Sequence, residues 1–443
     1  MDAADYGIGP NRMHPNVLFI AERLQEEGHE ALVVGGAVRD LILGQRPKDF
    51  DIATSARPEA VKHLFRNARI IGRRFRLVHI AFPDMTVEVA TFRGPARPDQ
   101  RGLIHKDNQF GSARQDAFRR DFTMNALSLD PHAMTIIDHV GGMADLQSRS
   151  IRSISPPQQS FREDPVRMLR AVRFMLRLGF TMDADVERAL RAEAPRLSDI
   201  SRHRLAEETQ RFLVGGMAYA AFDAFQRLGL LQPLLGLQAF ADFFPVAVRR
   251  SPHAALRPYL RGLDAWVVAR RPVIVPTVAL LGLLLTLGRQ GLRDALRGRG
   301  PEAATLFAAG RGAPLLQMLG EWGLLMGQIE PALAILRAAQ AILRDAGGPG
   351  AIRRHELVGE REALTLLGVM AEVLALPEAF VLAGLERIPA LPVLPILDHH
   401  MPLRRRDAGK DGKGGKPAAV GKSGAARPHA RRRRRPRGAT PQD

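Results

Sequence analysis

Residues 31–54, which read ALVVGGAVRDLILGQRPKDFDIAT, decide the fold class of this chain. The apolar run before Gly35 and Gly36 predicts a strand, and the segment after them predicts a short amphipathic helix. A second strand follows, with Asp49 and Asp51 two residues apart. Because alternate side chains of a strand share a face, both carboxylates can meet at one site. Glycine backbone can also approach a phosphate closely, so the stretch predicts two-metal phosphoryl or nucleotidyl transfer.

The composition is that of an ordinary folded protein. Of the 443 residues 46% are hydrophobic, and this length predicts two or three domains. The absence of cysteine excludes disulfides and cysteine-ligated zinc. Residues 1–17 lack the pattern of a signal peptide, and the longest apolar run, Val278–Leu287, is about half a membrane span. We therefore expect a cytoplasmic protein with no membrane partner, in which that run forms a buried helix.

Positive charge is concentrated near the carboxyl terminus. The formal net charge is +18; residues 401–443 carry 14 Lys and Arg against 3 acids, whereas the first 400 residues carry 50 against 43. From Arg404 onward large apolar residues almost vanish, so we expect a disordered tail. Such a tail binds polyanions by counterion release, although a purely solubilising role is the alternative. Its densest run, the candidate phosphate-binding group, is Arg431, Arg432, Arg433, Arg434 and Arg435.

The rest of the chain divides into a part with strands and a part without. Beyond Ser155, Leu, Ala and Arg recur at helical spacing to about Leu394 and strand signals vanish. Before Ser155, Pro58–Phe65 shows a helical pattern, with Ser55 as its candidate cap. The expected fold class is therefore α+β, with one mixed sheet followed by an elongated all-helical part. The expected strands are Leu32–Val34, Phe50–Ala53, Arg76–Phe82, Val87–Phe92, Thr135–Asp138 and Ile151–Ile154.

Two residues are candidates for a third acid beside Asp49 and Asp51. Glu88 alternates with apolar neighbours on a predicted strand, so it faces away from them and can point towards the two aspartates. Asp121 lies in a helix-like run that places it on one face with Asn125, four residues later. Spacing alone does not choose between Glu88 and Asp121, and Asp121 can equally serve as a helix cap.

A candidate base-reading pair lies at the start of a predicted helix. Asp164 and Arg167 are three residues apart and project to one side. A carboxylate beside a guanidinium accepts from an exocyclic amine and donates to the adjacent ring nitrogen, a pattern that suits adenine and cytosine but not guanine and uracil. The structural alternative is that Asp164 only caps the helix. A basic stripe continues along the helix through Arg170, Arg173 and Arg177.

Four motifs in this order resemble the class II nucleotidyltransferases, which comprise tRNA CCA-adding enzymes and bacterial poly(A) polymerases. They are GGAVRD (35–40), DFDIAT (49–54), RRDFTMNAL (119–127) and EDPVRMLRAVRF (163–174). The match extends over about residues 31–210 and ends in ISRHRLAEE (200–208), which is similar to the neck helix of the family. The string GRRFRL (72–77) and the basic tail resemble the bacterial poly(A) polymerase branch.

The resemblance implies a role for each motif. Asp49 and Asp51 match the metal-binding catalytic acids, and Asp121 matches a third catalytic acid. The remaining matches, all to nucleotide-binding positions, are Gly35, Gly36, Arg39, Arg120, Asn125, Asp164 and Arg167. The fold implied is a polymerase-beta-like head followed by a helical neck and body.

The domain boundaries expected from this resemblance follow the changes in composition. Residues 1–155 form the catalytic head. Residues 156–270 form a helical neck with the base-recognition motif and an RNA-binding region. Residues 271–400 form a helical body, and residues 401–443 form the basic RNA-binding tail.

The activity implied is template-independent addition of AMP from ATP to RNA 3′ ends, with two Mg²⁺ ions and release of pyrophosphate. Expected partners are ATP, the 3′ ends of messenger RNAs, small RNAs and decay intermediates, and RNA-decay proteins. The same site would also suit CCA addition to tRNA. A non-catalytic RNA-binding protein with a decayed head is a further alternative, against which the intact DFD motif at residues 49–51 argues.

The basic tail generates a direct prediction about RNA binding. Removing residues 404–443 should weaken the affinity for RNA and flatten its dependence on salt concentration, because fewer counterions are released when fewer phosphates are neutralised. Binding isotherms of the full and truncated chains across a salt series measure both quantities. Unchanged affinity at every salt concentration would assign the tail a solubilising role only.

Overall fold

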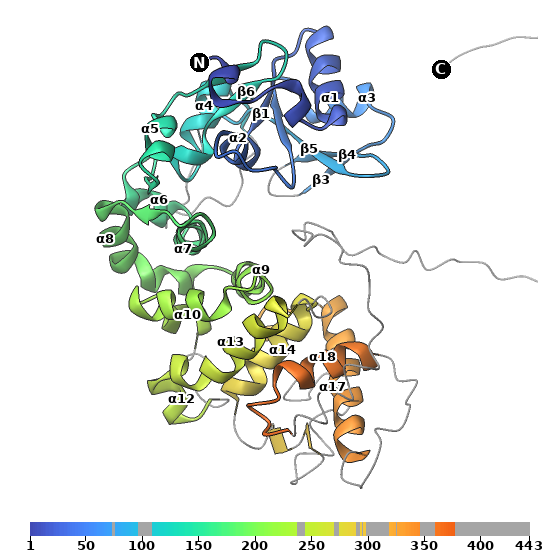
Figure 1. Ribbon diagram of the computed structural model, residues 1–443, viewed down its shortest axis with the longest axis vertical. Coiled ribbons are helices and arrows are strands. Elements are labelled where there is room, and N and C mark those ends of the chain that lie inside the picture. The colour runs from blue at the N-terminus through green and yellow to red at the C-terminus, as the bar shows by residue number, and fades with distance from the viewer. Residues whose placement is uncertain are drawn as a thin grey trace, which may run out of the picture. The chain divides into compact units, whose positions relative to one another are not determined.

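A computed structural model of the chain describes residues 1–72, 76–95, 109–236, 244–269, 274–288, 293–294, 296–297, 319–324, 326–345 and 359–376. The predicted α+β fold class is confirmed, with one mixed sheet in the amino-terminal part and helices after it (Figure 1). The tail predicted to be disordered, residues 401–443, lies outside the described residues.

Seven strands form the mixed sheet. β2 and β5 run parallel to each other, and the other neighbouring strands among those described are antiparallel. Two short strands, β8 (Ser150–Ile151) and β9 (Thr181–Met182), pair in parallel outside this sheet. The order across the sheet is β3 (Ala68–Ile71), β4 (Leu77–Ala81), β5 (Thr86–Thr91), β2 (Asp51–Thr54), β1 (Ala31–Val34), β6 (Ser128–Asp130) and β7 (Thr135–Ile137).

The two faces of the sheet have different environments. One face packs against α1 (Pro15–Glu26) and α3 (Pro58–Leu64), where Val87 and Val89 of β5 are fully buried in the main core (Figure 1). Alternate residues of each strand point to the opposite face. That face carries a smaller apolar cluster, formed by Leu32, Val34, Ala53 and Phe92.

Most of the predicted strands are found in the structure, and several local predictions are wrong. Five of the six lie in the main sheet with ends within one residue of those predicted, and in place of Ile151–Ile154 the structure has β8 outside that sheet. β3 and β6 are not among the predicted strands. The prediction of no strand beyond Ser155 is wrong at Thr181–Met182, a two-residue segment too short to show periodicity. The Ser55 cap is also wrong, because the Ser55 hydroxyl accepts from the Glu30 backbone N–H at 2.9 Å.

After the sheet the described part of the chain is mainly helical. Two of the helices used below are α7 (Val166–Leu178) and α9 (Arg202–Leu213). Gly179 adopts a left-handed conformation at φ 66° and ends α7. The other described helices are α2 (Gly36–Ile42), α4 (Ala113–Phe118), α5 (Gly142–Gln147), α6 (Pro157–Glu163), α8 (Ala184–Glu193), α10 (Ala218–Arg227), α11 (Leu231–Leu235), α12 (Val246–Arg250), α13 (Pro252–Val268), α14 (Pro276–Leu287), α17 (Met326–Asp345) and α18 (Glu360–Val369). Short 3₁₀ helices are η1 (Ala3–Tyr6), η2 (Pro10–Arg12), η3 (Thr123–Asn125) and η4 (Ala194–Asp199).

The apolar run Val278–Leu287 lies in α14 and is buried along its whole length, as predicted. The hydroxyl of Tyr259, on α13, donates to the Ala279 carbonyl, so the two helices are joined by a buried hydrogen bond as well as by apolar contact. Within the part of the chain that the structure describes, no helix has the length and apolar character needed to cross a membrane.

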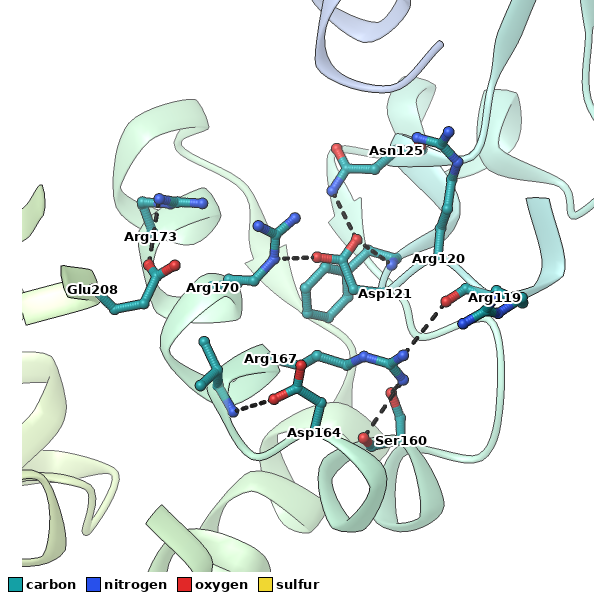
Figure 2. A network of polar contacts seen from close by, with 12 residues as sticks. Arg119, Arg120, Asp121, Asn125, Ser160, Asp164, Arg167, Arg170, Arg173 and Glu208 are labelled. Atoms are coloured by element: carbon teal, nitrogen blue, oxygen red, sulfur yellow. Dashed lines mark hydrogen bonds and ion pairs between the residues drawn. The ribbon is translucent and has the colours of Figure 1, made fainter. Parts of the chain in front are cut away.

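An ion pair between the buried Asp121 and the partly exposed Arg170 joins α7 to the sheet-bearing part of the chain. The Nε atom of Arg170, on α7, donates to Oδ2 of Asp121 at 2.6 Å (Figure 2). The other carboxyl oxygen of Asp121 accepts from Asn125 Nδ2 at 3.1 Å. Burial alone would raise the pKa of Asp121, but the Arg170 charge and the two hydrogen-bond donors lower it to about 2. Asp121 is therefore ionised and paired at neutral pH.

The aromatic ring of Phe174 lies at the same junction. It makes an edge contact with the buried Phe122, with ring centroids 5.9 Å apart. Three guanidinium groups surround it, with Arg39, Arg170 and Arg173 at 5.3, 5.6 and 5.6 Å from the ring centroid. Cation–π attraction of this kind strengthens when the groups are shielded from water. The junction thus combines apolar packing with charge.

Replacing Asp121 tests this junction. Asp121→Asn should lower the free energy of unfolding at pH 7 by about 2 kcal/mol, less than for a fully buried pair because 35% of the Arg170 side chain is exposed. Because the folded pKa of about 2 lies below the ordinary 3.8, the stabilisation is complete above about pH 4 and is lost as the pH falls towards 2.

Denaturant unfolding at pH 7 and at acidic pH measures this effect. The matched control is Asp185→Asn, because Asp185 and Arg188 form a pair with side chains 69% and 71% exposed. The control should change stability by less than ~0.5 kcal/mol. Equal effects of the two variants would contradict the structural role given to Asp121.

Candidate active site

The loop between β1 and α2 places glycine where a side chain would not fit. Gly35 has φ 74° and ψ −132°, a conformation that side chains other than glycine rarely adopt. A Cβ atom at this position would lie 3.0 Å from Nη1 of Arg120. The predicted glycine pair therefore forms a tight turn whose backbone faces a guanidinium group.

Asp51 and Glu88 lie side by side on parallel strands. Asp51 is the first residue of β2, and the pairing register sets it opposite Glu88 of β5. Asp49 precedes the strand, so the predicted strand start at Phe50 is one residue early and the two aspartates do not share a strand. Asp49 is nevertheless close enough for its charge to act on Asp51.

The surroundings of Asp51 disfavour the ionised form of its carboxyl group and raise its pKa. Its side chain reaches solvent at the end of the strand, yet the protein around the carboxyl group desolvates it and raises its pKa. The negative charges of Glu88 and Asp49 raise this pKa further, and the positive charge of Arg120 lowers it. The resulting pKa of Asp51 is about 7. The charges of two further carboxyl groups, Glu88 and Asp49, therefore act on Asp51 at the start of β2.

This gathering of negative charge suits a divalent cation. Carboxylate oxygens are the ligands that Mg²⁺ prefers, and a cation among them would relieve their mutual repulsion. Among the described residues no preformed group of three metal-ligating side chains is present, so the site fits the ion by its donor chemistry and not by closed geometry. Asp49, Asp51 and Glu88 are the residues that could hold it.

Asp121 is placed differently from these three acids. Both of its oxygens are occupied by Arg170 and Asn125 at the α7 junction. The acids whose charges shift the pKa of Asp51 are Glu88 and Asp49. Of the two candidates for the third acid, Glu88 is therefore the one that the structure sets beside Asp51.

Arg39 is enclosed in the protein. Only 3% of it is exposed, and its Nε and Nη2 atoms donate to Oδ1 of Asp40 at 2.8 and 2.6 Å. Its Nη1 atom donates to Asn125 Oδ1 at 2.7 Å. In the structure Arg39 therefore pairs with Asp40. Contact of Arg39 with a nucleotide phosphate stays a prediction. Asn125 links Arg39 to Asp121, which gives this amide a structural function.

Arg120 lies between the glycine turn and the acids. Its Nη2 atom donates to Asp116 Oδ2 at 3.0 Å and its Nη1 atom to the Asn125 carbonyl at 3.4 Å. Its charge also lowers the pKa of Asp51, which places it within electrostatic range of the acids. Because the glycine turn lies beside the same guanidinium, Arg120 is positioned to meet an anionic group bound there.

Asp164 and Arg167 are neighbours that have different partners (Figure 2). Both oxygens of Asp164 accept from Nη2 of Arg204, at 3.0 and 2.9 Å. Arg167 Nη1 donates to the Ser160 hydroxyl at 2.7 Å, and its Nη2 atom donates to the Arg119 carbonyl at 3.4 Å. The Asp164 carboxylate also accepts from the Val166 backbone N–H at 3.3 Å, at the first residue of α7. The residue that caps α7 is Pro165, so the expected cap at Asp164 is one residue early.

The partners Arg204 and His79 were missed in the sequence. Arg204 reaches Asp164 across 40 residues, and His79 reaches Glu88 from a neighbouring strand, with Nε2 and Oε1 3.0 Å apart. No local spacing signals either contact, because each depends on how distant elements pack. The predicted run Arg431–Arg435 lies outside the described residues.

Two family matches cover the part of the chain that contains this site. Residues 31–152 match the family described as the poly A polymerase head domain. Residues 179–241 match the one described as the probable RNA and SrmB-binding site of polymerase A. The first match includes the glycine turn and all four candidate acids.

Curated relatives are of two kinds. Poly(A) polymerase I of Escherichia coli O6:H1 is 44% identical over 239 residues, which cover 52% of this chain and 51% of that protein. The chain thus spans about half the length of the curated poly(A) polymerases it matches. The CCA-adding enzyme of Geobacillus thermodenitrificans is 35% identical over 316 residues, covering 64% of this chain and 78% of that enzyme.

A solved structure also relates this chain to the CCA-adding enzymes. The Bacillus stearothermophilus CCA-adding enzyme in complex with CTP matches with a TM-score of 0.57 and 29% identity, over 84% of this chain and 82% of that one. The sequence and structural matches therefore extend well beyond the head. The chain belongs to the class II nucleotidyltransferase family that contains the bacterial poly(A) polymerases and the CCA-adding enzymes.

Proposed function

We propose that this protein is a template-independent RNA polymerase that adds AMP from ATP to RNA 3′ ends. The observation that carries the proposal is the register of β2 and β5, which sets Asp51 beside Glu88 next to the glycine turn. Acids crowded beside a backbone turn that admits a phosphate form the arrangement needed for nucleotidyl transfer.

The reaction is an in-line displacement at the α-phosphate of the nucleotide. Asp49, Asp51 and Glu88 would hold Mg²⁺, which when bound lowers the pKa of the attacking hydroxyl and neutralises charge on the phosphates. The RNA 3′ hydroxyl loses its proton to solvent as its oxygen forms a bond to the α-phosphorus, and the bond from that phosphorus to the bridging oxygen breaks as pyrophosphate leaves. Arg120, beside the turn at Gly35, stabilises negative charge on the nucleotide phosphates.

Asp164 and Arg167 select the base. The carboxylate accepts from the exocyclic amine of adenine, and the guanidinium donates to the adjacent ring nitrogen. Arg204 holds the Asp164 carboxylate through both oxygens, and the Ser160 contact holds Arg167. Rotamers fixed in this way reduce the entropy lost when the base binds.

RNA contacts are proposed outside the head. The segment 179–241 matches a family described as a probable RNA-binding site, and the positive charge of residues 401–443 suits phosphates. The helical segments 156–270 and 271–400 would bind the strand whose 3′ end enters the site. RNA-decay proteins are proposed as further partners, as the resemblance to bacterial poly(A) polymerases implies.

CCA addition to tRNA is the second candidate function. The length of the match favours it, because this chain matches 78% of the CCA-adding enzyme but only 51% of poly(A) polymerase I. Polyadenylation is favoured by identity, 44% against 35%. The base-reading pair suits both adenine and cytosine, so it does not separate the two products.

Incubation of the full chain with an unstructured RNA and each nucleoside triphosphate separately tests the proposal. We expect long tails with ATP and Mg²⁺, and little extension with GTP or UTP. Asp51→Asn should reduce the rate by more than ~100-fold, because removing a direct ligand costs more than the loss of an outer-shell group. The control Asp185→Asn, at an exposed pair, should retain full activity. Full activity of Asp51→Asn would exclude the proposed site.

The Arg204 contact generates a prediction about selectivity. Arg204→Gln should loosen Asp164 and lower discrimination between ATP and GTP about tenfold, since two charge-assisted hydrogen bonds are lost. The KM for ATP should rise while kcat stays within a few-fold. Steady-state kinetics with each nucleotide measures this, with Arg188→Gln at the exposed pair as the control. Unaltered selectivity would show that Asp164 is oriented without Arg204.

A further inference from the structure

Four polar side chains lie in one row across neighbouring strands. Antiparallel pairing sets Arg69 of β3 opposite His79 of β4, and His79 opposite Glu88 of β5. Parallel pairing then sets Glu88 opposite Asp51 of β2. Residues directly opposite in a sheet project to the same face, so this row points away from the core that buries their neighbours.

Within the row, His79 contacts the acid next to Asp51. His79 Nε2 lies 3.0 Å from Glu88 Oε1, and the two side chains are 16% and 28% exposed. An ionised carboxylate can only accept hydrogen bonds, so Nε2 must carry the proton of this contact. His79 therefore restrains one oxygen of Glu88 and leaves the other for a ligand.

The contact is not needed to anchor β4. Val78 and Ile80, on either side of His79, are 1% and 0% exposed in the main core and hold the strand from its opposite face. The backbone ladder runs along β4 and β5 from Leu77 to Ala81 without a break at His79. A partly exposed imidazole on the other face thus adds little to the sheet itself.

We propose that His79 is a positioning residue that orients Glu88 to bind the active-site divalent cation together with Asp51. This rests on the proposed function, in which Glu88 is a ligand. Outer-shell partners of a ligating carboxylate limit its rotamers, so the ligand is already aimed when the cation arrives. The imidazole acts through Glu88 and has no contact of its own with the reacting phosphate.

Binding of Mn²⁺ alone to the full chain is the test, with the free ion measured by electron paramagnetic resonance. We expect His79→Ala to weaken Mn²⁺ binding ~10- to 100-fold, the range typical of lost outer-shell partners. His79→Gln should recover most of the affinity, because its amide can donate to the same oxygen. His63→Ala, on an exposed position of α3, should match the unaltered protein.

A second measurement separates positioning from folding. The Mg²⁺ concentration for half-maximal activity should rise in His79→Ala while kcat at saturating Mg²⁺ changes little, and the thermal midpoint in EDTA should match that of the unaltered chain. Equal Mn²⁺ affinities of His79→Ala and the unaltered protein would overturn the proposal, and so would equal losses in His79→Ala and His79→Gln.

The variant Glu88→Gln separates failure of the ligand role of Glu88 from failure of the positioning role of His79. If Glu88→Gln binds Mn²⁺ normally, Glu88 is not a ligand and that part of the proposed function is wrong. If Glu88→Gln loses Mn²⁺ binding while His79→Ala keeps it, the ligand assignment stands and the positioning role of His79 is wrong. Loss in both variants with recovery in His79→Gln is the outcome that we expect.

Discussion

The ion pair of Asp121 and Arg170 is the contact on which the arrangement of the site depends. It ties α7 to the segment that follows α4, and α7 begins next to Asp164, for which base reading is proposed. If α7 shifted, Asp164 and Arg167 would move relative to the acids on the sheet. The low pKa of Asp121 shows that its charge is stabilised by this pairing, so it serves to hold elements together.

A second constraint is the repulsion among the acids at the edge of the sheet. Asp51 has a pKa raised to about 7 by desolvation and by its acidic neighbours, whereas Asp121 has a lowered one because it is paired. The opposite shifts have different causes: Asp121 is paired with the cationic Arg170, whereas the negative charge of the acids that act on Asp51 suits it to a bound cation. Arg120 moderates the crowding from beside the glycine turn.

The fold class, most strands and the pair Asp49 and Asp51 could be predicted because they depend on local alternation and on motifs within a few residues. The strand face of Glu88 followed from alternation, but its choice over Asp121 needed the register of β2 against β5. Arg204 could not be predicted as the partner of Asp164, since that contact depends on the packing of α9 near α7. The helix-like run expected at residues 119–127 is wrong, since the structure has a 3₁₀ turn at Thr123–Asn125 there, but the predicted approach of Asp121 and Asn125 is present as a hydrogen bond.

We propose that this site makes adenylate tails and does not complete a tRNA end. The most direct measurement gives the full chain all four nucleoside triphosphates at equal concentration, with a tRNA transcript that ends before its CCA sequence and an unrelated RNA in the same tube. Sequencing of the 3′ ends should show runs of A longer than three nucleotides on both RNAs. Addition of CCA to the tRNA alone, with no extension of the unrelated RNA, would contradict the claim.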